Sequence, residues 1–278
     1  MKRPSKPKLF ENSKITAIKH VFGTSILAFL KACYPILVYV GIKLLVLFVL
    51  NLLPFTILDV VKEAIGSMVA LIYLVPVLRM DILTQSTVTF YRPREKEEKR
   101  QMWFRWIYGA VTITLISVAV NNILGYTALR DLSSSYEEVK EAFFAGSVLV
   151  QVICLGFLIP YAEEILFRGI IYGRAKEAFG PQKAIVISAL LFGVVHWNLL
   201  QFIFATIMGL VLAFFTEKYR SLIPAYLGHA AANIIVVLHA AGEHYFGSYP
   251  LFHLVVTIIA IVGSGLLFLL QFRVKKLS

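Results

Sequence analysis

The chain has 278 residues, of which 59% are hydrophobic and 15% are charged. This composition lies well outside that of ordinary soluble domains and predicts a polytopic membrane protein. The net charge of +11 does not indicate a nucleic-acid partner, because the basic residues cluster at the ends of apolar segments, where they act as topology signals. Cys33 and Cys154 lie within apolar stretches, so they predict neither a disulfide framework nor a cysteine-based metal site.

The first part of the chain is basic and then becomes apolar. Residues 1–31 predict a cytoplasmic or interfacial N-terminus, with an interfacial lead-in near 15–31. The following apolar run reaches Leu53, which is too far for the core of a cleavable signal peptide. A first span is therefore expected near 32–53. Lys43 lies near its middle and is expected to face the bundle interior, against a polar group or a partner carboxylate.

Residues 32–278 predict a single all-α transmembrane domain with about eight helices. After the first span, the others are expected near 63–79, 104–124, 142–176, 183–198, 199–217, 221–241 and 251–272. The segment 80–105 is rich in basic residues, whereas the linker 125–141 has an acidic excess. The positive-inside rule then predicts a multi-pass protein of the cell membrane with both termini in the cytoplasm.

The fourth predicted span contains two adjacent glutamates and an arginine. Ionisable groups are costly inside a membrane and persist there when they are paired, hydrated or used in chemistry. Glu164 and Arg168 are four residues apart on one helix face and can form an ion pair, whereas Glu163 points about 100° away from Glu164. We expect the helix to continue through Arg168 to about Lys176, bent but not ended by Pro160. Only a helix that continues to about Lys176 places the three motifs at the same depth in the membrane.

Two later segments each place two polar or aromatic residues four positions apart, which is one turn of a helix face. They are Phe192 with His196, and His229 with Asn233. Together with Glu-Glu-x-x-x-Arg, these motifs resemble the CPBP family of intramembrane endopeptidases, named for CAAX-prenyl and bacteriocin processing. The resemblance covers a catalytic core of about 145–240 and implies peptide-bond hydrolysis inside the membrane.

The same residues have the chemistry that hydrolysis needs, namely a base for water and donors for the oxyanion. Glu163 and His196 are expected to hold and activate the water, with Glu163 returning its proton to the leaving amine. His229 and Asn233 are expected to stabilise the oxyanion, and the resemblance implies the same four assignments. The supporting residues are Glu164, Arg168 and Phe192.

Several alternatives stay open at this point. Glu163, His196 and His229 also form a set suited to zinc, although the His-Glu-x-x-His pattern of soluble zinc peptidases is absent and the resemblance favours chemistry without a cofactor. Buried polar groups can also merely hold helices together. The chain is then a non-enzymatic bacteriocin-immunity or scaffold protein, or else a transporter with a proton relay.

Nothing in the sequence selects the substrate of the enzyme reading. A prenylated tail, a pheromone or bacteriocin precursor and a membrane protein all fit as the membrane-associated substrate. His239 and His253 match no pattern and are interpreted as packing or interfacial residues.

Overall fold

The computed structural model describes residues 8–84, 96–127, 140–246 and 250–273. Within these ranges the secondary structure is helical, without strands. The elements are α1 (Lys8–Asn51), α2 (Asp59–Thr84), α3 (Lys96–Gly125), α5 (Val148–Gln151), the π-helix η1 (Val152–Leu158), α6 (Ile159–Glu164), the π-helix η2 (Ile165–Ile171), α7 (Tyr172–Phe179), α8 (Pro181–Val194), α9 (Leu199–Tyr219), α10 (Ile223–Phe246) and α11 (Pro250–Arg273).

Seven of the described helices are long and apolar enough to cross a membrane, which confirms the all-α polytopic fold. Their spans are Ser25–Asn51, Asp59–Thr84, Arg100–Gly125, Val148–Phe179, Leu199–Tyr219, Ile223–Glu243 and Pro250–Leu270. Large apolar side chains such as Leu37 and Ile72 are exposed on the outer faces of these helices. The predicted lead-in 15–31 and the first span are not separate elements, because α1 runs through both.

About eight spans were predicted, and the described residues contain seven long apolar helices and one shorter one, because the segment expected at 183–198 forms a short helix. α8 has 14 residues and so is about 21 Å long, less than the ~30 Å of a hydrocarbon core. The chain turns after Val194, where Trp197 takes a left-handed φ of 60°. Asn198 then caps α9, since its side chain accepts a hydrogen bond of 2.8 Å from the Gln201 amide.

α8 and α9 form a hairpin whose backbones approach closely at two glycines. A Cβ added to Gly193 would lie 2.1 Å from Oγ1 of Thr206, and one added to Gly209 would lie 2.7 Å from Cα of Ala189. Small residues at such contacts let helices pack tightly inside a membrane. The hairpin therefore holds the end of α8 in a fixed position against the rest of the bundle.

The fourth span is one continuous helix from Val148 to Phe179, so it passes through Arg168 as predicted and ends just before Gly180. The sequence analysis did not predict its two π-helical turns, η1 and η2. In each, an amide donates to the carbonyl five residues back, from Ile159 to Cys154 and from Tyr172 to Phe167. Such wide turns are often found at functional sites.

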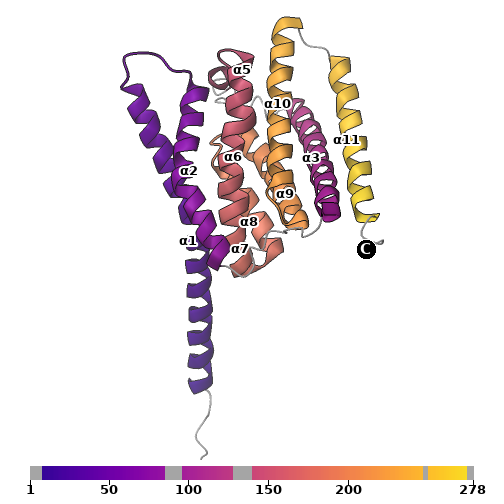
Figure 1. Ribbon diagram of the computed structural model, residues 1–278. Coiled ribbons are helices and arrows are strands. Elements are labelled where there is room, and N and C mark those ends of the chain that lie inside the picture. Colours follow the sequence, from indigo (N-terminus) through magenta and orange to yellow (C-terminus); the bar gives the residue numbers. More distant parts are fainter. Residues whose placement is uncertain (1–7, 85–95, 128–139, 247–249, 274–278) are drawn as a thin grey trace, which may run out of the picture.

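The continuous helix α5–α7 lies in the middle of the bundle (Figure 1). α1 pairs with α2 on one side of it, α3 and α11 lie on the other, and α8, α9 and α10 pack nearby. α1 begins and α11 ends at the same end of the bundle (Figure 1).

Ion pairs join helices where charged side chains enter the bundle. Lys43 of α1 pairs with Glu63 of α2, which confirms that this lysine faces a partner carboxylate. Arg174 of α7 holds Asp81 of α2 through two contacts, with Nε 2.7 Å from Oδ2 and Nη2 3.2 Å from Oδ1. The α1–α2 pair is thus fastened to the central helix as well as to itself.

Candidate active site

The three sequence motifs meet around the ring of Phe192. Its centroid lies 5.0 Å from that of His196, 5.0 Å from that of Phe167 and 5.8 Å from that of His229. These residues come from α8 and the turn after it, from η2 and from α10. The segments separated by up to about 70 residues in the sequence therefore converge on one site.

A single carboxylate oxygen of Glu164 contacts both Arg168 and His229 at the centre of this site. Oε1 of Glu164 lies 3.0 Å from Nη1 of Arg168 and 2.8 Å from Nδ1 of His229. The predicted ion pair is therefore present, and it extends to α10 through a contact that helical spacing alone did not reveal. Both Glu164 and Arg168 are 1% exposed, so the pair is closed to solvent and to substrate.

The guanidinium of Arg168 depends on this single carboxylate. Its Cζ lies 4.3 Å from the centroid of the Phe192 ring, at cation–π distance. Among the described residues no hydrogen-bond acceptor reaches its Nε or Nη2. Glu164 is accordingly its hydrogen-bonding partner within this part of the chain, and the pair is a structural element of the site.

Glu163 has a different environment from its neighbour. Its side chain is 14% exposed, against 2% for Glu164, and its Oε2 lies 3.7 Å from Nε2 of His229. This distance is too long for a hydrogen bond and leaves the carboxylate without a tight partner there. Of the two adjacent glutamates, only Glu163 can be reached by a water molecule or a substrate.

His196 lies two residues beyond the end of α8, so the prediction that it shares a helix face with Phe192 is wrong. Its side chain nevertheless folds back on the last turn, and Nδ1–H donates a hydrogen bond of 2.7 Å to the carbonyl of Phe192. This bond fixes the tautomer, because a carbonyl only accepts. Nε2 of the neutral ring is then an acceptor for a water hydrogen.

The tautomer of His229 is set in the same way. Nδ1–H donates to Glu164, so Nε2 of the neutral ring carries a lone pair that faces Oε2 of Glu163. Nε2 of His229 and Oε2 of Glu163 are then two hydrogen-bond acceptors that face each other, unless one of them carries a proton. His229 can donate to an oxyanion only as an imidazolium, a requirement that the sequence analysis did not recognise.

Asn233 fastens α10 to the central helix. Its Nδ2 donates a hydrogen bond of 2.9 Å to the carbonyl of Leu155 in η1. That carbonyl lacks a backbone donor because the amide of Ile159 reaches back to Cys154 and Pro160 has no N–H. The π-turn and the proline thus create the acceptor that Asn233 uses, and its second amide hydrogen stays available for an oxyanion.

The α1–α2 pair supplies a wall of the site that sequence reasoning missed. The buried hydroxyl of Tyr39 lies 3.1 Å from Oγ of Ser67, and Nζ of Lys43 lies 4.8 Å from the centroid of the Tyr39 ring. Tyr39 belongs to the same buried cluster as Phe167 and Phe192. The one signal for this wall in the sequence was a lysine in the middle of an apolar span.

The described residues contain one group of His, Cys, Asp and Glu whose ligand atoms all lie within 4.8 Å of one another, and it is not at this site. It consists of His239, Glu243 and His253 at the α10–α11 end of the bundle. Glu163, His196 and His229, the zinc ligands of the alternative mechanism, do not form such a group.

The segment that carries the three motifs is similar to a known family. Residues 145–235, which include all three motifs, match the family described as "Type II CAAX prenyl endopeptidase Rce1-like". The chain is 28% identical over 137 residues to "UPF0177 protein YxdF" of Lactococcus lactis subsp. lactis (strain IL1403), covering 46% of this chain and 72% of that protein.

A second relative is named as a peptidase. The chain is 32% identical over 133 residues to "Putative membrane peptidase YdiL" of Bacillus subtilis (strain 168), covering 48% of this chain and 54% of that protein. The chain thus spans about half the length of this relative. No solved structure shows significant similarity. These comparisons support a membrane protease at the level of the family.

Proposed function

We propose that the chain is an intramembrane endopeptidase, since residues 145–235, which carry all three motifs, match the family described as "Type II CAAX prenyl endopeptidase Rce1-like". Its substrate is a membrane-associated peptide or protein. The observation that carries this proposal is the contrast between the two glutamates. Glu164 is closed within an ion pair, whereas the carboxylate of Glu163 is accessible beside two histidines. Such an arrangement holds one carboxylate in place and leaves the other to act as a base.

In this mechanism a water molecule lies between the carboxylate of Glu163 and Nε2 of His196. Glu163 takes a proton from the water as the oxygen attacks the carbonyl carbon of the peptide bond. A tetrahedral intermediate forms with a negative charge on the former carbonyl oxygen. Glu163 then gives its proton to the leaving nitrogen as the C–N bond breaks. The products are a carboxylic acid and an amine, and Glu163 returns to its starting charge.

Asn233 and His229 stabilise the oxyanion in this scheme. Asn233 uses the amide hydrogen that does not bond to Leu155. His229 acts as an imidazolium, with Nδ1–H held by Glu164 and Nε2–H directed at the oxyanion. Preorganised donors of this kind are typically worth about 10²–10³ in rate each.

The protonated form of His229 also balances the charges of the site. Arg168 neutralises Glu164, and an imidazolium at His229 neutralises Glu163, so the four groups together carry no net charge. A neutral cluster is far less costly than an isolated charge in a hydrocarbon environment. Phe167 and Phe192 are buried beside it and exclude bulk water from the reaction.

No metal or other cofactor takes part in the proposed reaction. The zinc-dependent alternative predicts that a strong chelator abolishes cleavage and that zinc restores it. The proposed mechanism predicts that cleavage by the purified protein persists in the chelator. Sensitivity to the chelator with recovery by zinc, seen also in a variant that lacks the separate His239, Glu243 and His253 cluster, would replace the proposed base by a metal-bound water.

The protein is further proposed to lie in the cell membrane with both termini in the cytoplasm. Reporter fusions in the 80–102 and 125–141 segments test this topology, and they should report opposite sides. A result that places both segments on one side contradicts it.

The substrate is found most directly by comparing membrane-associated peptides from cells that carry the wild type or Glu163→Gln. Glutamine is nearly isosteric but cannot take the proton, so cleavage products should be present only with the wild type. If the variant retains the full biological activity at normal protein level, the protein acts without catalysis, as an immunity or scaffold protein.

A further inference from the structure

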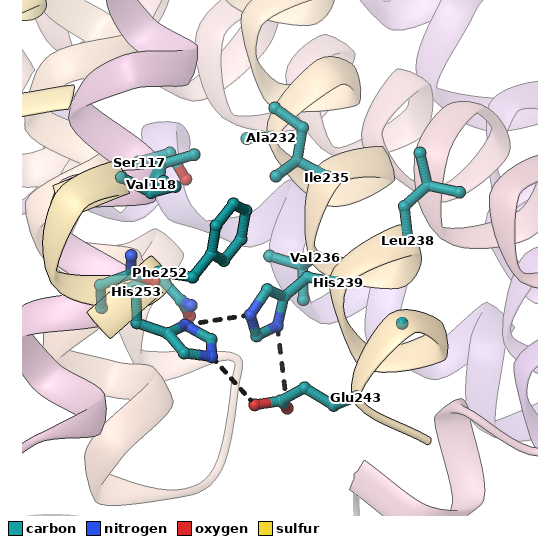
Figure 2. A pocket seen from close by; sticks show the side chains of 14 residues that line it. Ser117, Val118, Ala232, Ile235, Val236, Leu238, His239, Glu243, Phe252 and His253 are labelled. Atoms are coloured by element: carbon teal, nitrogen blue, oxygen red, sulfur yellow. Dashed lines mark hydrogen bonds and ion pairs between the residues drawn. The ribbon is translucent and has the colours of Figure 1, made fainter. Parts of the chain in front are cut away.

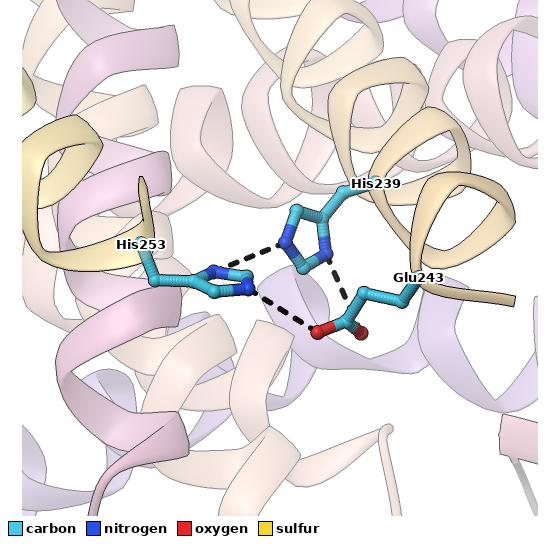
Figure 3. Close-up of side chains that lie close together, drawn as sticks. All are labelled: His239, Glu243 and His253. Carbon is cyan, nitrogen blue, oxygen red and sulfur yellow. Dashed lines mark hydrogen bonds and ion pairs between the residues drawn. The ribbon is translucent and has the colours of Figure 1, made fainter. Parts of the chain in front are cut away.

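A second cluster of chemistry-bearing side chains lies at the far end of α10, away from the candidate active site. His239 is ten residues beyond His229, or about 15 Å along the helix. It lies near Glu243 of the next turn and His253 of α11 (Figure 3). Neither the family match nor the proposed peptidase mechanism uses any of these three residues.

All four imidazole nitrogens of the cluster face another member. Nε2 of His239 lies 3.1 Å from Nδ1 of His253, and Nε2 of His253 lies 3.3 Å from Oε1 of Glu243. The third side of the triangle is longer, with 3.8 Å between Nδ1 of His239 and Oε2 of Glu243. The three side chains thus form a closed ring of contacts (Figure 3).

This ring has too few hydrogens to be satisfied by itself. Two neutral imidazoles supply one N–H each, and an ionised carboxylate supplies none. If the two N–H groups fill the two short contacts, Nδ1 of His239 and Oε2 of Glu243 face each other as two acceptors at 3.8 Å. A cation removes this opposition because it accepts lone pairs from the facing atoms.

The spacing and chemistry of the donors fit a transition metal. Zinc binds imidazole nitrogen and carboxylate oxygen at about 2.0–2.2 Å, so neighbouring donors of a tetrahedral site lie roughly 3.3–3.5 Å apart. Each of the three residues offers one ligand atom, and these atoms lie within 4.8 Å of one another, so small rotations of the side chains bring them to that separation. We propose that His239, Glu243 and His253 form a binding site for a divalent transition metal of the zinc class.

The site is both accessible and anchored. The side chains of His239 and Glu243 are 35% and 38% exposed, so an ion can enter, while that of His253 is 12% exposed. His253 is held from behind, because its carbonyl accepts a hydrogen bond of 2.7 Å from Thr257, whose hydroxyl accepts one of 2.9 Å from Asn122 of α3. These bonds fix the backbone of α11 at His253 against α3.

The three ligands lie at one end of a mainly apolar cavity between α3, α10 and α11 (Figure 2). The cavity measures about 490 Å³, within the usual range for sites that take small molecules. Three protein ligands leave a coordination position for water or for a donor atom from the cavity. A bound metal would fasten α11 to α10, the helix that also carries His229 and Asn233.

The test measures metal in the purified full-length protein after removal of any affinity tag. The protein is stripped with a chelator in detergent, dialysed against zinc, and analysed for bound metal. Replacement of the bound zinc by cobalt gives a visible absorption spectrum that reports tetrahedral coordination by nitrogen and oxygen ligands. We expect about one ion per chain, bound more than ~100-fold more weakly in His253→Ala, since even outer-sphere changes cost 10–100-fold.

Two matched controls locate the ion. Asn121→Ala alters the same cavity without removing a ligand, and Glu163→Gln alters the candidate active site; both should bind the metal as the wild type does. Glu243→Gln is nearly isosteric and replaces His253→Ala if that variant does not fold. The proposal is overturned if the wild type binds no metal. A proton, rather than a cation, then joins the facing acceptors of the three side chains. It is also overturned if Glu163→Gln loses the ion while His253→Ala keeps it. Neither result bears on peptide cleavage.

Discussion

Glu164 and Arg168 form an ion pair in which 3.0 Å separates Oε1 from Nη1 and neither side chain is more than 2% exposed. The same oxygen receives a hydrogen bond from His229, so the pair positions a residue of the candidate active site. Glu164 therefore has a structural role, whereas the adjacent Glu163 stays available for chemistry.

The variant Glu164→Ala should lose stability. It leaves the arginine buried without its carboxylate, and breaking a buried pair from one side costs about 3–5 kcal/mol. Glu163→Ala is the matched control, because Glu163 is partly exposed and lacks a tight partner. Thermal unfolding of both proteins in detergent measures the difference. A less stable Glu163→Ala, beside a stable but inactive Glu164→Ala, would reverse the two roles.

Asn233→Ala should lower both activity and stability, by different amounts. The loss of an oxyanion donor reduces kcat by about 10²–10³, whereas the loss of the bond to Leu155 costs about 1–3 kcal/mol of unfolding free energy. Cleavage rates normalised to the folded fraction separate the two effects. Asn233→Asp keeps the size but cannot donate, so it should also be slow. If the normalised rate is unchanged in both variants, Asn233 only fastens α10 to η1.

Lys43 and Glu63 should prove energetically coupled across α1 and α2. Lys43→Met leaves the carboxylate without its partner, and Glu63→Gln leaves the ammonium without its own. Coupling between contacting groups amounts to about 0.5–3 kcal/mol. The double variant should therefore be more stable than the sum of the two single losses predicts. Additive losses in a double-mutant cycle of unfolding would show that the pair contributes nothing.

Local patterns predicted the parts of the structure that depend on one helix alone. The apolar runs indicated the all-α membrane fold, and the spacing of Glu164 and Arg168 indicated their ion pair. The continuation of the fourth helix through Arg168 also followed, because no other register brings Glu163 and His196 to one depth. Each of these features is set by the period of the helix and by the polarity of its environment.

Other features depend on neighbours that a helical period does not identify. The bond of His229 to Glu164 joins residues 65 positions apart, and the periodic pattern gives no sign of the π-turn at Val152–Leu158. The early end of α8 was missed because the apolar pattern continues past Val194. His239 and His253 were interpreted as packing or interfacial residues, although Glu243 stands four residues after His239 on the same helix.

The central claim is that Glu163 activates the water for peptide hydrolysis. The most direct test is cleavage of an identified membrane peptide by purified wild type and Glu163→Gln, with the thermal unfolding of both recorded in the same detergent. The account predicts loss of cleavage in the variant at an unchanged unfolding temperature. Cleavage by Glu163→Gln at the rate of the wild type would contradict it.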